Sequence, residues 1–188
     1  MKVLVLFGSP HKKGFTSGLL DFFLAFLDKN CEVTVINSYD EAVRPCIGCE
    51  KCKTGKCIFN DMEKINFLVN SSDVIVVASP VYNASFPAPL KAIFDRFQPY
   101  YFKRSSINKK FVLLLTAGSR KIDYLPVILA QINPVIKILG GELLGEITLK
   151  GTDFLNKFDI DKFYSKSENK ARNIIENFEK INVRINCI

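Results

Sequence analysis

Residues 3–17 read VLVLFGSPHKKGFTS, and this stretch decides the fold. Its first five residues are apolar without alternation, which is typical of a parallel strand that is buried on both faces. The run is too short for the apolar core of a signal peptide. Gly8, Ser9 and Pro10 then break the strand, and apolar residues return at helical spacing from Leu19 onward. A strand that passes through a short polar loop into a helix is the first half of a β-α-β unit.

Four more apolar runs follow, and helix-length segments separate them. The runs lie at residues 33–36, 74–78, 111–115 and 143–149. We predict helices over residues 16–28, 62–70, 88–98, 124–139 and 162–180, with Asp61 as the N-cap of the second. This alternation predicts an α/β fold, a doubly wound five-stranded parallel sheet with helices on both faces, in three α/β/α layers. For the strand order 2-1-3-4-5, the ligand crevice lies between the first and third strands.

Length and composition limit the number of domains and the kinds of partner. The chain has 188 residues, which fits one domain over residues 1–188 with a cysteine-rich loop at about 44–60. Its net charge is +7, from 26 Lys and Arg minus 19 Asp and Glu. The lysines are scattered and no basic stripe carries interleaved aromatics, so we expect no nucleic-acid partner, although a phosphorylated ligand would suit the charge. No apolar run approaches the ~18 residues of a membrane span, so we expect no membrane partner and a cytoplasmic protein.

The loop after the first strand is a candidate anion site. Ser9, Thr16 and Ser17 are potential donors, and the helix that follows offers free backbone N–H groups at its N-terminus. The loop contains neither the Gly-Lys-Ser/Thr triplet of a Walker A motif nor a GxGxxG dinucleotide turn. The alternative is a plain strand-to-helix turn in which Thr or Ser caps the helix.

Two further loops should lie at the same edge of the sheet. Residues 79–89 read SPVYNASFPAP, in which three prolines stiffen the chain around Tyr82. Such a loop suits contact with a flat ring, and the alternative is a rigid connection with Tyr82 packed on the surface. Residues 116–119 read TAGS, where Gly118 permits close approach of a ligand or simply makes a turn. Together the three loops suit a phosphate joined to a flat heterocycle.

Four cysteines fall within the twelve residues CIGCEKCKTGKC, at positions 46, 49, 52 and 57. The spacing suits a [4Fe–4S] cluster held by Cys46, Cys49, Cys52 and Cys57. A loop of free thiols is the main alternative. Zinc is less favoured because structural zinc sites use two separated pairs, and a disulfide because the protein is predicted to be cytoplasmic. We take Cys31 and Cys187 as ordinary residues.

The loops and the cysteine run resemble the NAD(P)H-dependent FMN reductases, which have the flavodoxin-like fold. Residues 8–18, GSPHKKGFTSG, are similar to the phosphate loop of that family, and residues 79–96, SPVYNASFPAPLKAIFDR, to its flavin-ring loop and the following helix. The cysteine run with residues 58–62 is similar to a segment of many of these proteins, including iron–sulfur flavoproteins. His11 and Phe15 depart from the usual phosphate loop, where Arg and Asn are common.

The resemblance implies non-covalently bound FMN and a homodimer or higher homo-oligomer. It places the phosphate on the first loop, at Ser9, His11, Lys13, Phe15, Thr16 and Ser17. It places the ring against the other two loops, at Pro80, Val81, Tyr82, Asn83, Ala84, Thr116 and Gly118. The flavin carries the redox chemistry, so no side chain is expected to be catalytic.

The implied function is an FMN-dependent NAD(P)H oxidoreductase. NADH or NADPH is the expected electron donor, and a quinone, a flavin, another small molecule or a protein is the expected acceptor. The alternative is an iron–sulfur flavoprotein or a flavodoxin-like electron carrier that serves protein partners. The high positive charge disfavours a flavodoxin-like carrier, because such carriers tend to be acidic.

Overall fold

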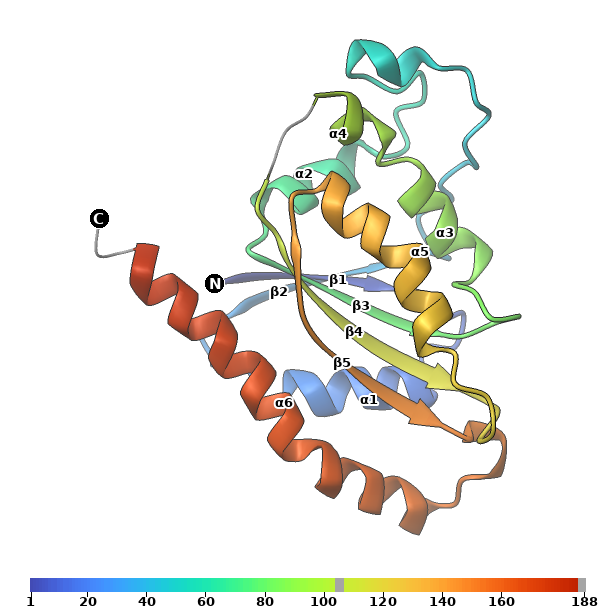
Figure 1. Ribbon diagram of the computed structural model, residues 1–188, viewed down its shortest axis with the longest axis vertical. Coiled ribbons are helices and arrows are strands. Elements are labelled where there is room, and N and C mark those ends of the chain that lie inside the picture. Colours follow the sequence, from blue (N-terminus) through green and yellow to red (C-terminus); the bar gives the residue numbers. More distant parts are fainter. Residues whose placement is uncertain (104–106, 186–188) are drawn as a thin grey trace.

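Five parallel strands form one sheet (Figure 1). The strand order is β2-β1-β3-β4-β5, which confirms the predicted order 2-1-3-4-5. The computed structural model describes residues 1–103 and 107–185, so Cys187 lies outside the described residues. The strands are β1 Lys2–Phe7, β2 Glu32–Asn37, β3 Val74–Pro80, β4 Lys110–Ala117 and β5 Glu142–Lys150.

Helices cover both faces of this sheet. Those joining the strands are α1 Phe15–Leu24, α2 Glu63–Ser71, α3 Ala88–Asp95, α4 Gln98–Lys103 and α5 Leu125–Ile138, and α6 Lys157–Ile185 follows the last strand. Buried residues of α2, α3, α4 and α5 form one core with the sheet, and those of α1 and α6 form a second core on the opposite face. Two short 3-10 helices, η1 Lys51–Thr54 and η2 Thr152–Phe154, lie in loops. The three predicted layers are therefore present.

Two sequence predictions about the helices are wrong. The helix predicted over residues 88–98 ends earlier, at Asp95, and a separate helix, α4, begins at Gln98, where Pro99 is tolerated because the N–H groups of a first turn have no partner within the helix. Asp61 is not the N-cap of α2. That helix begins at Glu63, its N-cap is Met62, and no side chain caps it. The Asp61 carboxylate instead binds Arg96 and Arg44. The C-terminal helix also begins earlier and ends later than predicted.

The cysteine loop, residues 44–60, extends beyond the end of the sheet between β2 and α2 (Figure 1). Its 3-10 helix η1 packs against α4. This loop and α4 therefore form one corner of the molecule, apart from the loops that follow β1 and β3. In the part of the chain that the structure describes, every helix is too short or too polar to cross a bilayer.

Candidate functional site

The loops after β1, β3 and β4 lie side by side at the carboxyl edge of the sheet. The Gly8 N–H donates to the Ala78 carbonyl at 2.8 Å, which joins the start of the first loop to β3. The Val81 N–H donates to the Thr116 carbonyl at 2.8 Å, which joins the second loop to β4. Strand pairing thus continues into the loops and holds them next to one another, as the strand order requires.

The hydroxyl groups of the first loop are all engaged within the protein. Ser9 is buried, and its Oγ accepts a hydrogen bond from the His11 N–H at 3.2 Å. Thr16 is also buried, and its Oγ1 lies 2.8 Å from Oγ1 of Thr116. Ser17 Oγ accepts from the Gly14 N–H at 2.8 Å and donates to the Gly14 carbonyl at 2.9 Å. These bonds fix the loop, so its free donors are mainly backbone N–H groups.

The N-terminus of α1 is electropositive. The first N–H groups of a helix have no partner within that helix, and here they belong to Phe15, Thr16 and Ser17. No acidic residue occupies the first turn, and exposed Lys13 and His11 precede it. This arrangement attracts an anion through the helix dipole and the nearby lysine.

A tight turn forms the tip of the second loop. The Tyr82 N–H donates to the Ser85 carbonyl at 3.0 Å, and the Ser85 N–H returns a bond to Tyr82 at 2.9 Å. Asn83 and Ala84, between them, have φ of 50° and 59°, a left-handed conformation that is uncommon for alanine. Gln131 of α5 holds the turn, because its Oε1 accepts from Ser85 Oγ at 2.8 Å and its Nε2 donates to the Ala84 carbonyl at 3.1 Å.

The turn presents an aromatic ring beside a rigid strand end. Tyr82 is 42% exposed, whereas Pro80 is buried at the end of β3 and Val81 is half-buried. A positive φ at a non-glycine residue costs free energy, and such strain tends to occur at functional sites. The second loop therefore has a fixed, partly exposed shape.

Gly118 of the third loop meets a side chain that the sequence analysis missed. A Cβ at Gly118 would collide with the Asp153 carboxylate, which lies against this glycine from η2. Arg120 joins the same two loops, since its Nη2 donates to the Phe154 carbonyl at 3.0 Å. On the side where a Cβ would lie, Gly118 is thus covered by the Asp153 carboxylate.

The four clustered cysteines line one hollow of about 240 Å³. Cys46 and Cys49 are exposed, Cys52 and Cys57 are partly buried, and all four are free thiols. Burial raises the pKa of Cys52, and the neighbouring Cys46, Cys49 and Cys57 thiols raise it further. The four sulfurs are therefore close enough to interact.

This hollow fits a cluster better than a single ion. Among the described residues, no three Cys, His, Asp or Glu side chains are grouped so that they could hold one metal ion. In a cubane cluster each thiolate binds a different iron atom, so the thiols surround a volume and do not converge on a point. Four thiols around one hollow satisfy that requirement.

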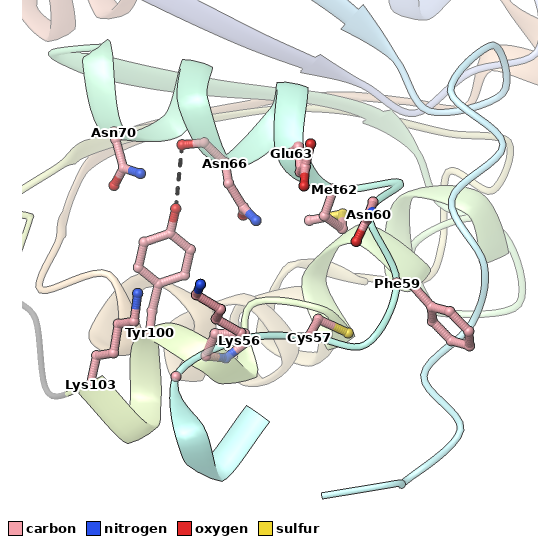
Figure 2. A pocket seen from close by; sticks show the side chains of 12 residues that line it. Lys56, Cys57, Phe59, Asn60, Met62, Glu63, Asn66, Asn70, Tyr100 and Lys103 are labelled. Carbon is pink, nitrogen blue, oxygen red and sulfur yellow. Dashed lines mark hydrogen bonds between the residues drawn. The ribbon is translucent and has the colours of Figure 1, made fainter. Parts of the chain in front are cut away.

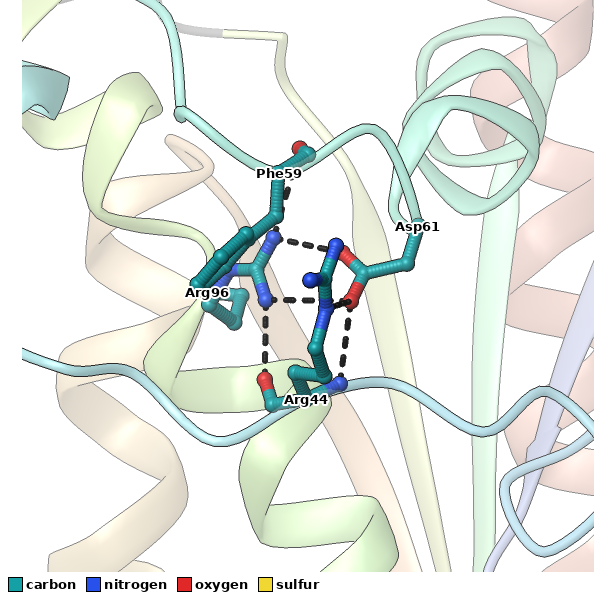
Figure 3. A network of polar contacts seen from close by, with 4 residues as sticks. All are labelled: Arg44, Phe59, Asp61 and Arg96. Carbon is teal, nitrogen blue, oxygen red and sulfur yellow. Dashed lines mark hydrogen bonds and ion pairs between the residues drawn. The ribbon is translucent and has the colours of Figure 1, made fainter.

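A network of polar contacts joins the two ends of the cysteine loop (Figure 3). We call Arg44, Phe59, Asp61 and Arg96 the Arg96 network. Arg96 Nη2 donates to Asp61 Oδ1 at 2.6 Å, and its Nη1 donates to the Arg44 carbonyl at 2.8 Å. Arg44 Nε reaches Asp61 Oδ2 at 3.2 Å, and the Arg44 guanidinium lies 3.9 Å from the centre of the Phe59 ring. One arginine of the helical scaffold thus holds residue 44 and residues 59–61 together.

The charges of this network stabilise one another. The side chains of Arg96 and Asp61 are 1% and 16% exposed. Burial alone raises the pKa of Asp61, but hydrogen bonds from Arg96 and Arg44 outweigh it and lower that pKa below 3.8. Burial alone lowers the pKa of Arg96, but Asp61 and the nearby Cys57 thiol raise it overall. Arg96 also lines the hollow of the four thiols, and its buried Nε has no hydrogen-bond partner among the described residues.

Comparison with known proteins identifies the family. Residues 1–134 match the model of the NADPH-dependent FMN reductase family. The chain belongs to this family. The match includes the three loops and the cysteine run, which confirms the resemblance seen in the sequence.

Several proteins similar to this chain carry the name iron–sulfur flavoprotein. One from Methanocaldococcus jannaschii is 38% identical over 102 residues, which is 53% of this chain and 53% of the relative. One from Clostridioides difficile is 28% identical over 189 residues, which is 95% of this chain and 78% of the relative. The chain spans about half the length of the first two curated relatives, at 53% and 47%.

Solved structures share the fold. The chain is similar to the NAD(P)H:quinone oxidoreductase from Methanothermobacter marburgensis, with a TM-score of 0.76 and 19% identity over 93% of this chain and 96% of that one. It is also similar to an FMN-dependent NADH-azoreductase from Bacillus anthracis in complex with FMN, with a TM-score of 0.68 and 17% identity over 93% and 100% of the two chains. These likenesses confirm the flavodoxin-like fold.

Proposed function

We propose that this chain is an FMN-dependent oxidoreductase that takes electrons from NADH or NADPH and passes them to a quinone, a flavin or another acceptor. The observation that carries the proposal is the meeting of three loops at one edge of the sheet, joined by the Thr16–Thr116 hydroxyl pair at 2.8 Å. Membership of the NADPH-dependent FMN reductase family supports it. The expected homodimer or higher homo-oligomer and the cytoplasmic location remain predictions.

The first loop would hold the FMN phosphate. Backbone N–H groups at the start of α1 would donate to the phosphate oxygens, and the Lys13 ammonium would add charge. The Ser9, Thr16 and Ser17 hydroxyls keep the loop in shape, and Ser17 is the one that lies partly exposed. His11 and Phe15 are exposed, so they would flank the phosphate without disturbing the core.

The second loop would hold the flavin ring. Pro80 and Val81 end β3, and the Tyr82–Ser85 turn would bring the Tyr82 ring and the backbone of Asn83 and Ala84 to the edge of the flavin. Thr116 and Gly118 would face it from the third loop. Because Gln131 fixes the turn through Ala84 and Ser85, little order would have to be created when FMN binds.

FMN, when bound, supplies the hydride acceptor and the route to the second substrate. The residues of the three loops would bind and orient the flavin. None of the named residues needs to transfer a proton. The protein therefore contributes position and polarity, and its specificity for the acceptor depends on the surface around Tyr82.

Turnover with a nicotinamide separates an oxidoreductase from an electron carrier. We expect the purified chain, loaded with FMN, to consume NADH or NADPH in the presence of a quinone or ferricyanide. The loss of nicotinamide absorbance measures the rate, and protein without added FMN is the control. Protein that binds FMN but oxidises neither nucleotide would be a carrier, and protein that takes up no FMN would contradict the whole proposal.

Ser17→Ala tests the phosphate position. We expect FMN to bind about two- to tenfold more weakly, since the variant loses the Ser17 Oγ bonds that hold Gly14 at the start of α1, and such a hydrogen bond is worth about 0.5–1.5 kcal/mol. Quenching of FMN fluorescence measures the affinity. Ser71→Ala is the matched control, because that serine is exposed at the end of α2. We avoid Thr16→Ala because it would leave the buried Thr116 hydroxyl without its partner. Equal affinity in both variants would move the phosphate elsewhere.

The hollow of the four thiols favours a second function alongside the first. Thiolates of Cys46, Cys49, Cys52 and Cys57 would hold a [4Fe–4S] cluster, which supplies one-electron transfer. Arg96 supports this assignment, because its buried and unpartnered Nε–H in the wall of the hollow would meet an anionic occupant there. The chain would then be an iron–sulfur flavoprotein that serves one-electron partners.

A further inference from the structure

A second hollow adjoins the four-thiol hollow. It has a volume of about 430 Å³, and it opens between the end of the cysteine loop, α2 and α4 (Figure 2). Cys57 and Pro99 line both hollows. The lining of the second is otherwise different, because it contains two lysines and three asparagines.

Five polar side chains that line this hollow have no polar partner among the described residues. Among the described residues, the side chains of Lys56, Asn60, Glu63, Asn66 and Lys103 make no hydrogen bond or ion pair. The Oδ1 atom of Asn66 is buried and has no hydrogen-bond partner among the residues that the structure describes. An unsatisfied buried polar atom costs about 1–3 kcal/mol and calls for an explanation, which is commonly a bound molecule.

These groups are sorted onto opposite walls. The side chains of Asn66 and Asn70, one helical turn apart on α2, point toward the hollow from one side. Lys56 and Lys103 face them from the other side, with the Tyr100 ring between (Figure 2). Gly55 has a φ of +83°, and a Cβ there would lie 2.8 Å from Cε of Lys103, so this glycine makes room for the lysine stem. The absence of a side chain at Gly55 therefore lets the Lys103 stem pack against the cysteine loop.

The Tyr100 hydroxyl belongs to the amide wall. It donates to the Asn66 carbonyl at 3.4 Å, and burial raises the pKa of Tyr100 to about 12. The phenol is thus neutral over the physiological range and adds no negative charge to the hollow. Two lysines against one glutamate, Glu63, leave a net positive lining.

We propose that this hollow binds an adenosine phosphate. The two lysines would hold the phosphate, as ammonium groups commonly do. Rotation of the Asn66 amide would turn its buried, unpartnered Oδ1 toward the adenine edge, where an asparagine can accept from the N6 amino group and donate to N7. Apolar surface from Met62, Pro99 and Tyr100 would cover the base. The inference is independent of the proposed flavin site, which lies at the loops after β1 and β3.

Titration with AMP, followed by calorimetry on protein saturated with FMN, tests the proposal. We expect one AMP per chain, and affinity that falls about ten- to a hundredfold in Lys56→Met and in Lys103→Met. Lys51→Met is the matched control, because that lysine belongs to the same loop but does not line the hollow. Ribose 5-phosphate should bind at least about tenfold more weakly than AMP because it lacks the base contacts.

Four results would overturn the proposal. They are no heat with AMP whether or not FMN is present, equal affinity in both lysine variants and the Lys51 control, equal affinity for ribose 5-phosphate, and AMP binding that occurs only in protein without FMN. The last would place AMP in the flavin site. The same titration without FMN keeps the result interpretable if the chain does not bind flavin, so failure of the proposed function and failure of this inference are distinguishable.

Discussion

Replacement of Arg96 by methionine is expected to lower the free energy of unfolding by about 3–5 kcal/mol, because it leaves the carboxylate of Asp61 without its buried partner. Methionine keeps most of the apolar stem, so the loss arises from the charge and its hydrogen bonds. The Arg44 carbonyl would also lose its donor, at present 2.8 Å away. Chemical denaturation followed by circular dichroism measures the change.

Two variants separate the buried pair from other effects of losing an arginine. Arg172→Met is the matched control, because Arg172 pairs with Glu168 on the surface at 55% and 45% exposure, and such pairs are worth at most about 1 kcal/mol. In Arg96→Met combined with Asp61→Leu, much of the lost stability should return because no unpaired buried charge remains and Arg44 is exposed to solvent. A loss of less than about 1 kcal/mol in Arg96→Met would contradict the role of this pair.

The effect of Arg96→Met should depend on pH. In the native protein the pKa of Asp61 lies below 3.8, so the stability from this group is complete at higher pH and is lost as pH falls through the lowered pKa. In the variant, Asp61 keeps the exposed Arg44 but loses the buried Arg96, so the pKa of Asp61 rises relative to that of the native protein. The difference in unfolding free energy between the two proteins should therefore shrink below about pH 4.

Local patterns in the sequence were sufficient to predict the sheet. Strands such as β3 and β4 are continuous apolar runs because both faces are buried, and their spacing leaves room only for helical crossovers. The sheet order then places the loops after β1 and β3 together, so the positions of Ser9 and Tyr82 at one edge follow. The sequence does not predict which atoms of these loops are free to bind a ligand.

Contacts between distant residues could not be predicted in this way. Thr16 and Thr116 are 100 positions apart, and nothing local to either indicates that their hydroxyls meet. Asp61 precedes a helix and therefore has the sequence signature of an N-cap, but the charge of Arg96 attracts it more strongly. One signal was present. Arg96 follows the apolar residues Ile93 and Phe94 and precedes Phe97, and an arginine in such surroundings indicates a buried acidic partner.

The same network explains how a polar, exposed loop keeps a defined shape. The segment from residue 44 to residue 61 has few apolar side chains of its own to bury, and its two ends are held by Arg96 and Asp61. Closing a loop at its base restricts the chain between, so the thiols need less ordering when they bind a metal cluster. Stability of the network and retention of iron should therefore be linked.

Iron content gives the largest effect expected for the cysteine loop. Anaerobically reconstituted protein should hold about four iron atoms per chain, and Cys49→Ser should hold almost none, because a cubane cluster needs its thiolate ligands. Cys31→Ser is the matched control and should retain all the iron, since Cys31 lies outside the loop, next to the start of β2. Arg96→Met should lose iron although its four thiols are intact, because the base of the loop opens.

FMN binding should be unchanged in Cys49→Ser, which keeps the first, second and third loops intact. Iron assay and flavin absorbance, read on the same samples, check both statements. Native protein that holds no iron after anaerobic reconstitution would leave the four cysteines as a loop of free thiols, and iron loss in Cys31→Ser would place a ligand outside the hollow.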